Sequence, residues 1–491
     1  MFNLVDEAWI PVRGADGRAA ELSLRELFAR AEDVSELAIA FAPERMAVTR
    51  ILVAVLQSAL RGPSGIRERA RWLQEPQVIV ARVIDYLDEW RWRFDLFDSE
   101  RPFMQQPIGD RVARSTIAAL KLDWASGNNV TLFDHHVDAR PAELRPAEAA
   151  RALLTTLLYQ PGGGVSVPFN RTDSPGARPL FAMAIGRSLW EDMVLNTAAL
   201  PSDGADAPIW ERDEDHLPRK EGTVPLGWLD RVTWRSRAVQ LECDSDGLVR
   251  SCRVHQHLRI VDGPPFDPFA PVRRVEGEEP RPVRAGSGRR LWRSADTVLR
   301  GLADRQQPPV VAQAVDTLER LGHAGAPQML LVAMQVERGK IADAQSARLP
   351  VSGALLADAD RLDFVTWQLE QAAVGARAIR AGIMSLLRSL GAKPESAHAG
   401  SWVEQHWATL APRFSAVLQQ VAEADIAPAL NGALAADWNR TVASAARSVF
   451  ERVRTQAAPG PRHFEALARA TRAFNRALRP ITAASTERAI T

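Results

Sequence analysis

The sequence contains very little lysine: four of its 61 Lys and Arg residues are lysine, so that 57 are arginine. The 60 Asp and Glu residues balance them to a formal net charge of +1, which excludes a wholly basic nucleic-acid binder of the histone kind. Any such binding has to come from local patches. Arginine binds phosphate in a bidentate manner that lysine cannot match, but a GC-rich genome would produce the same excess. The count alone does not separate these explanations.

Cysteine and long apolar runs are also scarce. Cys243 and Cys252 form no C-x-x-C pair and have no second pair to complete a zinc site, and so few cysteines fit a reducing compartment. Residues 1–12 lack the basic and apolar regions of a signal peptide. Apolar runs such as residues 51–56 are far shorter than the roughly 18 residues of a membrane span. We therefore predict a soluble, cytoplasmic protein with no zinc and no cofactor.

The chain is 46% hydrophobic and 25% charged, as globular proteins are. Ser23 and Glu26 have the spacing of a capping box at the start of a helix. Residues 46–61 and 146–159 have a helical period, and residues 233–241 and 248–261 predict a hairpin. An aromatic-rich stretch predicts core positions at Trp90, Trp92, Phe94, Phe97 and Phe103.

Toward the C-terminus the helical period dominates. Four long helices with short breaks are predicted at residues 360–390, 401–424, 432–455 and 461–478, which implies a four-helix bundle. We therefore predict an α+β, predominantly helical fold. A mixed N-terminal domain is expected at 1–355 and the bundle at 356–491.

The last of these helices has two distinct faces, and Pro480 is expected to end it. One face predicts packing through Phe464, Leu467, Phe474 and Leu478. The other face carries an arginine ladder, defined by Arg469, Arg472, Arg476 and Arg479. This ladder is either a solvated basic face or a contact surface for phosphates or an acidic partner.

Three motifs could carry chemistry. Asp134, His135 and His136, followed by Asp138, have the D-H-H order of metal-dependent phosphoesterases, although no D-x-D cluster upstream completes such a site. His255 and His257 could supply half of a metal site. Gly162, Gly163 and Gly164 leave the backbone bare, which suits either a flexible turn or the close approach of a ligand. No common phosphate-binding or hydrolase motif occurs, so the residues give no positive support for an enzyme.

Four segments, in this order along the chain, resemble the CasA family. They are F-N-L-x-x-E-x-W-I-P-V at 2–12, L-F-D-x-x-R-P-F-x-Q at 96–105, N-N-V-T-L-F-D-H at 128–135 and Q-P-G-G-G at 160–164. CasA is the large subunit of the type I-E CRISPR surveillance complex, Cascade. The resemblance implies a non-enzymatic subunit that reads the protospacer-adjacent motif in duplex DNA, mainly from the minor groove. It also implies help in strand separation and recruitment of the helicase–nuclease. The implied partners are the other Cascade subunits, the guide CRISPR RNA and target double-stranded DNA.

The resemblance also assigns roles to residues of this sequence. Gly162, Gly163 and Gly164 would lie against the minor groove of the adjacent motif, where side chains would clash with base edges. Leu132, Phe133 and Asp134 would form the loop that docks near the guide RNA and a neighbouring subunit. The remaining roles are a minor-groove finger at Gln256 and Arg259, a strand-separating wedge at Arg338, Gly339 and Lys340, and phosphate contacts from the arginine ladder. In the family the finger carries a lysine and the wedge often carries a glutamine. This sequence has no lysine in the finger and no glutamine in the wedge.

Two other functional classes stay open at this level. One is a metal-dependent phosphoesterase that uses Asp134, His135, His136 and Asp138. The other is a helical scaffold with no role in nucleic-acid binding.

Overall fold

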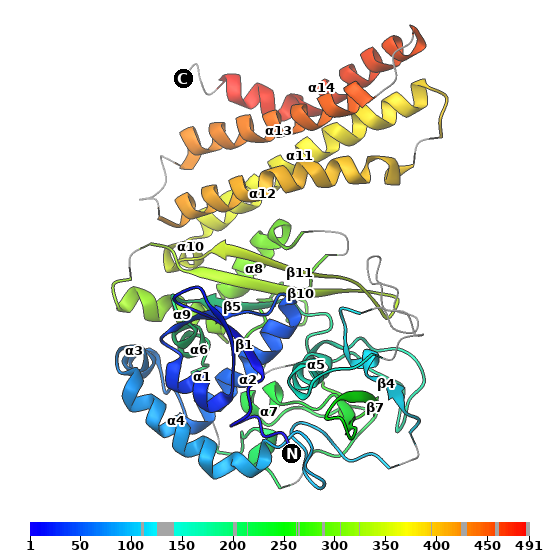
Figure 1. Ribbon diagram of the computed structural model, residues 1–491. Coiled ribbons are helices and arrows are strands. Elements are labelled where there is room, and N and C mark those ends of the chain that lie inside the picture. The colour runs from blue at the N-terminus through cyan, green and yellow to red at the C-terminus, as the bar shows by residue number, and fades with distance from the viewer. Residues whose placement is uncertain are drawn as a thin grey trace. The chain divides into compact units, whose positions relative to one another are not determined.

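The structure is a computed structural model. It describes residues 1–109, 112–124, 142–199, 204–213, 215–261, 263, 266–286, 290–304, 306–323, 325–393, 395–423, 430–456 and 461–487. The chain forms two compact units (Figure 1): the first comprises Met1–Leu291 and Arg300–Arg348, and the second comprises Trp292–Leu299 and Leu349–Thr491. The sequence-based boundary at 355/356 had assigned residues 292–299 to the N-terminal domain. Within the described ranges, no helix combines the length and the apolar character that crossing a membrane requires.

A buried helix, α2 (Ala42–Leu60), lies in the core of the first unit and packs against α4, α5, α6 and α7. The predicted capping box is confirmed at α1, where the Ser23 hydroxyl accepts from the Glu26 amide and the Ser23 amide donates to Glu26. The other helices are α1 (Leu24–Arg30), α3 (Ile66–Gln74), α4 (Pro76–Trp90), α5 (Pro146–Tyr159), α6 (Leu189–Leu195), α7 (Trp228–Val232) and α9 (Val310–Arg320). Helix α8 (Ala295–Leu302) crosses the boundary between the units.

The strands of the first unit form small sheets. Their orders are β2–β1–β3, β11–β10–β5, β4–β7–β6 and β8–β9. The predicted hairpin is confirmed as β6 and β7, with Leu241 opposite Cys252. The strands are β1 (Ile10–Gly14), β2 (Ala19–Leu22), β3 (Val34–Leu37), β4 (Ser115–Thr116), β5 (Phe181–Ile185), β6 (Arg237–Cys243), β7 (Val249–Gln256), β8 (Val272–Arg273), β9 (Arg281–Pro282), β10 (Gln328–Glu337) and β11 (Lys340–Pro350).

A buried ion pair fixes α2 to a distant segment of the first unit. The two terminal nitrogens of Arg50 lie 2.8 and 2.7 Å from the two carboxylate oxygens of Asp267. The guanidinium lies 4.8 Å from the ring centroids of both Phe181 and Phe269. Because Arg50 is 1% exposed, removing either charge would leave the other buried and unpaired.

The aromatic-rich stretch is only partly core. Phe94 and Phe103 are buried, and their rings lie 5.0 Å apart and pack on Trp210. Trp90 and Phe97 are half-buried, whereas Trp92 is 54% exposed. The prediction that all five are core residues is therefore wrong for Trp92, whose ring lies beside the guanidinium groups of Arg93 and Arg101.

The second unit contains four long helices that run alongside one another (Figure 1). Helices α11 and α13 contact each other, and α12 and α14 each contact both of them. The helices are α10 (Gly353–Ala357), α11 (Ala359–Ser389), α12 (Gly400–Glu423), α13 (Ala435–Gln456) and α14 (Pro461–Glu487). Together with the first unit they confirm the predicted α+β, predominantly helical fold.

Two predictions for the last helix are wrong. Helix α14 continues through Pro480 to Glu487, and the buried side chain of Ile481 extends its packing beyond the proline. Phe464 is 69% exposed and does not belong to the packing face. That face consists of Ala466, Ala470, Phe474, Leu478 and Ile481. Two of these residues are alanines, Ala466 and Ala470, which the spacing of large apolar residues alone did not predict.

A histidine is buried among the helices of the second unit. His406 of α12 is 0% exposed, and its Nε2 lies 3.0 Å from the carbonyl oxygen of Ala372 in α11. Gly375 makes room for the ring, since a Cβ there would lie 2.6 Å from His406 Cε1. Burial, with a smaller contribution from the charge of Arg293, lowers the pKa of His406 to about 4.

We expect the stability of this unit to depend on pH through His406. The pKa of His406 in the folded protein is below the ordinary 6.5, so the folded state favours the neutral imidazole. The stabilisation of the folded state by this neutral imidazole is therefore complete above pH 6.5 and is lost as the pH falls toward 4. The loss should be about 3 kcal/mol in the free energy of unfolding. Denaturant unfolding between pH 7 and 4 measures it. The variant His406→Leu should lack this pH dependence, and a control at the exposed histidine, His398→Leu, should keep it.

Candidate nucleic-acid interface

The three consecutive glycines lie in a loop that follows α5 and folds back on itself. The amide of Gly163 donates to the Arg171 carbonyl over 2.9 Å, and the amide of Gly162 donates to Asp173 Oδ1 over 2.7 Å. Residues 161–164 and 171–173 therefore run side by side as the two stems of what we call the glycine loop, residues 161–173. The loop is ordered by these hydrogen bonds and is more than a flexible turn.

The glycines meet two different requirements. A Cβ on Gly162 would lie 2.7 Å from backbone atoms of both Thr172 and Asp173, so this position needs glycine for close packing. Gly163 and Gly164 have φ values of +121° and +82°, which side-chain-bearing residues rarely adopt. Both are exposed, with no atom near the position of a Cβ. The bare backbone at Gly163 and Gly164 therefore faces outward.

A hairpin tip touches the glycine loop. Strands β10 and β11 are joined by Arg338 and Gly339, whose φ values of +51° and +75° are those of a type I′ turn. A Cβ on Gly339 would lie 3.1 Å from the carbonyl oxygen of Gly162. The structure thus brings the predicted wedge and the predicted groove-binding glycines together, although they lie more than 170 residues apart in sequence.

A cleft of about 550 Å³ opens at this junction. Gly162, Gly163, Arg259, Arg338 and Gly339 all line it, so three segments singled out in the sequence share one site. Gly164 and Lys340 are exposed but do not line it. Arg259 is held in position by a hydrogen bond from its Nη1 to the Lys220 carbonyl, 2.7 Å away.

The cleft is strongly basic. Five arginines line it, and Asp173 is the single carboxylate among its lining residues. Three of these arginines were missed in the sequence: Arg171, Arg178 and Arg284. Arg284 lies within residues 271–300, where eight arginines stand against four acidic residues, and this local excess of positive charge pointed to it. No pattern in the sequence pointed to Arg171 or Arg178, because only the tertiary structure brings them to the cleft.

The prediction for Gln256 needs correction. Gln256 is 0% exposed, so its side chain cannot reach a DNA groove. Its Oε1 accepts from the Thr172 amide over 2.8 Å, and its Nε2 donates to the carbonyls of Ser236 and Leu258. The amide is fully used inside the protein, where it ties the end of β7 to the glycine loop.

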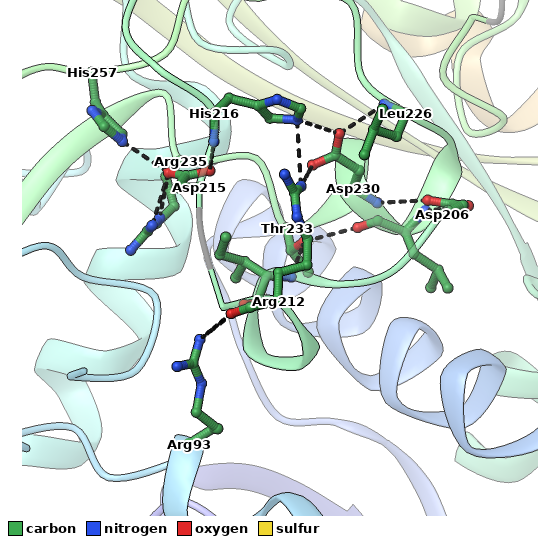
Figure 2. Close-up of polar contacts among 12 residues, drawn as sticks. Arg93, Asp206, Arg212, Asp215, His216, Leu226, Asp230, Thr233, Arg235 and His257 are labelled. Carbon is green, nitrogen blue, oxygen red and sulfur yellow. Dashed lines mark hydrogen bonds and ion pairs between the residues drawn. The ribbon is translucent and has the colours of Figure 1, made fainter. Parts of the chain in front are cut away.

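A network of charged side chains anchors the segment between Gln256 and Arg259 (Figure 2). His257 Nε2 lies 2.9 Å from Asp215 Oδ2, and Arg235 pairs with the same carboxylate over 2.8 Å. Next to it, Asp230 accepts from Arg212 and His216 at 2.5 and 2.7 Å. His257 is therefore a buried structural residue, and the proposed half of a metal site at His255 and His257 is not assembled: these histidines bond to Val167, Gln256 and Asp215.

The pKa values of this network follow from its geometry. Burial alone would raise the pKa of Asp215, but the hydrogen bond from His257 and the charge of Arg235 outweigh it and lower the pKa to about 2. Burial is also the largest influence on His257 and lowers its pKa. Asp215 is therefore ionised at neutral pH, and it holds Arg235, which lies two residues before β6.

Other predicted residues lie elsewhere. Leu132, Phe133 and Asp134 of the docking loop, and with them His135, His136 and Asp138, lie outside the described residues. Within the described ranges, no group of three or more His, Cys, Asp or Glu residues could hold a metal ion. Cys243 is exposed and Cys252 is buried, and both are free thiols.

The arginine ladder belongs to α14 in the second unit, and all four of its residues are exposed. Arg469 pairs with Glu465 at 2.5 Å. In the part of the chain that the structure describes, no carboxylate pairs with Arg472, Arg476 or Arg479. These three guanidinium groups are available to a partner.

The comparisons with known proteins agree on one family. The model of the CRISPR-associated protein Cse1 family matches residues 3–449. The chain belongs to the Cse1 family. A CRISPR-associated protein CasA/Cse1 of Thermus thermophilus is 29% identical, over 97% of each protein, and the family assignment therefore confirms the resemblance to CasA.

Solved structures share the fold of this Cse1 chain. A CRISPR-associated protein from Thermus thermophilus has a TM-score of 0.80 at 24% identity, covering 98% of this chain and 99% of that one. Cse1 from Acidimicrobium ferrooxidans has a TM-score of 0.77 at 24% identity, covering 98% of both. A chain of a CRISPR RNA-guided surveillance complex has a TM-score of 0.75 at 22% identity, covering 96% of this chain and 99% of that one.

We expect Asp215→Asn to destabilise the protein by about 3 kcal/mol at pH 7, because it leaves Arg235 without its carboxylate in a largely buried position. The stabilisation by the ionised carboxylate exists above pH 3.8 and is lost as the pH falls toward 2. The difference between variant and wild type should therefore shrink in that range. Denaturant unfolding at several pH values measures it.

Asp213→Asn is the matched control. Asp213 lies two residues away, but its side chain is 95% exposed and its contact with Arg101 is 3.4 Å long. Its loss should change the free energy of unfolding by less than about 0.5 kcal/mol. Equal effects of the two substitutions would contradict the role assigned to Asp215.

Proposed function

We propose that this chain is the Cse1 subunit of an RNA-guided CRISPR surveillance complex and that its basic cleft reads the protospacer-adjacent motif in duplex DNA. The observation that carries the proposal is the junction of the glycine loop, Arg259 and the β10–β11 hairpin tip at one cleft lined by five arginines. One structure with this fold is described as a CRISPR RNA-guided surveillance complex. The proposed partners are the other Cascade subunits, the guide CRISPR RNA and target double-stranded DNA.

The cleft suits the minor groove of DNA for steric and electrostatic reasons. The minor groove is only about 6 Å wide, so backbone without side chains enters it more easily than ordinary loops do. Gly163 and Gly164 offer such a backbone. Guanidinium groups are favoured in narrow minor grooves, and Arg259 is a candidate for that contact. The other cleft arginines would bind the phosphates that border the groove, and such contacts position the duplex without reading its sequence.

The hairpin tip is suited to act on the adjacent base pairs. Because Gly339 lies against Gly162, a duplex held on the glycine loop would have its next base pairs close to Arg338 and Lys340. Both side chains are cationic and exposed, so we propose that they stabilise the backbone of a separating strand and that guide pairing then supplies sequence specificity. The chain itself would break no covalent bond. Cleavage falls to the helicase–nuclease that the complex recruits.

Two further surfaces complete the proposal. Leu132, Phe133 and Asp134 would dock near the guide RNA and a neighbouring subunit. The arginine ladder of α14 would bind phosphates of the target DNA without sequence preference, with an affinity that falls as the salt concentration rises.

We expect Gly163→Leu to weaken binding to motif-bearing duplex about tenfold, because a side chain would occupy the groove. The measurement uses the guide-loaded complex and a duplex library with a fixed target and randomised flanking bases. Wild type should enrich particular flanks, and the variant should enrich them much less. Assembly of the complex should be unchanged.

The control is Gly247→Leu, at a glycine with φ +79° and open space around it in the β6–β7 turn. Both substitutions impose the backbone strain of a positive φ, about 1–3 kcal/mol, but only Gly163 lies at the cleft. Absence of any flank preference in the wild-type complex would exclude the proposed recognition. Equal losses in both variants would assign the effect to strain.

Reversing two charges of the ladder, with Arg472→Glu and Arg476→Glu together, should weaken DNA binding evenly across sequences. The slope of log affinity against log salt should become shallower by about 2, since two phosphate contacts are lost. Affinities at several salt concentrations measure this.

The matched control reverses Arg440 and Arg454 of α13, which are exposed but already paired with Asp437 and Glu451 at 3.1 and 2.8 Å. It should change the slope much less. A loss confined to certain flanking sequences would contradict the role of the ladder.

A further inference from the structure

A buried arginine lies at the base of the glycine loop. Arg237 begins β6, is 0% exposed, and directs its guanidinium at both stems of the loop. Its Nη2 lies 2.6 Å from the Thr172 carbonyl on one stem and 3.3 Å from the Pro161 carbonyl on the other. Its Nε donates to Gln160 Oε1 over 3.0 Å. One side chain thus closes the loop at its base.

The acceptors of Arg237 are neutral oxygens. Besides the loop carbonyls, its Nη1 donates to the Ser236 carbonyl and to Gln256 Oε1, 3.0 and 3.1 Å away. Among the described residues, no carboxylate forms an ion pair with it. Burial is the main cause that lowers its pKa to about 9; the nearby charge of Arg171 adds to this effect, and the charge of Asp173 opposes it. Burying a cation without a directly bonded carboxylate is costly, so the contacts that it makes have to compensate.

Gln256 completes this arrangement. Its Oε1 accepts both from Arg237 Nη1 and from the Thr172 amide, while its Nε2 is held by the Ser236 and Leu258 carbonyls. Arg237 therefore bonds the Thr172 carbonyl and Gln256 bonds the Thr172 amide, so both backbone polar groups of that residue are fixed. A lysine could not replace Arg237, because an ammonium has three donors and lacks the planar fork.

We infer that Arg237, with Gln256, is the positioning residue of the glycine loop. It holds Gly162, Gly163 and Gly164 in the shape that a DNA groove requires before DNA arrives, and it keeps a positive charge beneath them. A loop ordered in advance loses less conformational entropy on binding. The inference rests on the proposed function for its DNA-binding consequence, but the ordering of the loop is a property of the free protein.

The test compares Arg237→Lys with Arg69→Lys. Arg69 is equally buried, and burial likewise lowers its pKa, to about 10. It bonds Thr197 and Gln313 in the same unit, and it does not line the cleft. Both substitutions remove a buried guanidinium. Only Arg237→Lys should accelerate hydrogen–deuterium exchange at the amides of Gly163 and Thr172. Only Arg237→Lys should also lower the enrichment of the preferred flanking sequences, and we expect each of these two changes to be about tenfold.

A second variant covers the case in which Arg237→Lys does not fold. Gln160→Leu removes one acceptor of Arg237 at a half-buried position and leaves the charge in place. It should accelerate exchange at the same two amides to a smaller extent. Unchanged exchange in this variant and in any folded Arg237→Lys protein would overturn the inference.

The other outcomes are also decisive. Full flank discrimination by Arg237→Lys, or an equal loss in Arg69→Lys, would overturn the positioning role. If the wild-type complex discriminates no flanks, the proposed function fails, and the exchange rates alone then decide whether Arg237 orders the loop.

Discussion

Buried arginines join segments of the first unit that lie far apart in the chain. Arg50 of α2 pairs with Asp267, and Arg69 of α3 bonds Thr197 and Gln313. Arg237 joins both stems of the glycine loop to β7. Because a buried guanidinium is costly unless its donors are bonded, each of these residues forces its partners into register. Lysine has fewer donors and no planar geometry, so it could not make these connections.

The same residue type has a different role at the cleft. Arg259, Arg284 and Arg338 are exposed there, whereas Arg237 is buried and bonds the stems of the glycine loop. The many arginines of this chain therefore do not share one role. Some donate hydrogen bonds inside the protein, some line the cleft, and some form the arginine ladder of α14. Arg259, held by its bond to the Lys220 carbonyl, is one of the arginines that line the cleft.

The glycine loop combines rigid stems with a bare tip. Gly162 is packed against the opposite stem, and the Gly339 turn touches it from another strand. A Cβ on Gly163 or Gly164 would meet no atom within 4 Å, and both residues use backbone angles that other residues avoid. This division explains why three glycines stand together: one serves packing inside the protein, and two leave the surface free.

Local signals were sufficient for much of the fold. The Ser23 capping box, the β6–β7 hairpin and the long helices depend on neighbours within a few residues, and the structure has them. The predictions that failed depend on distant neighbours. Pro480 lies inside a helix because buried packing continues beyond it, and Trp92 and Phe464 are exposed because the packing of distant segments leaves them at the surface.

The candidate site also combines features that local sequence determines with features that depend on distant residues. The sequence by itself determined that residues 162–164 have a bare backbone, since the absence of a side chain is a property of glycine itself. Only the tertiary structure decided that a two-residue turn joins β10 to β11 and touches the glycine loop, that Gln256 is buried and Arg259 exposed, and that Arg171, Arg178 and Arg284 join them at one cleft. The physical reason is that burial and charge clustering depend on which segments pack together, and hydrogen bonds between residues more than 60 positions apart, such as those of Arg237, determine that packing.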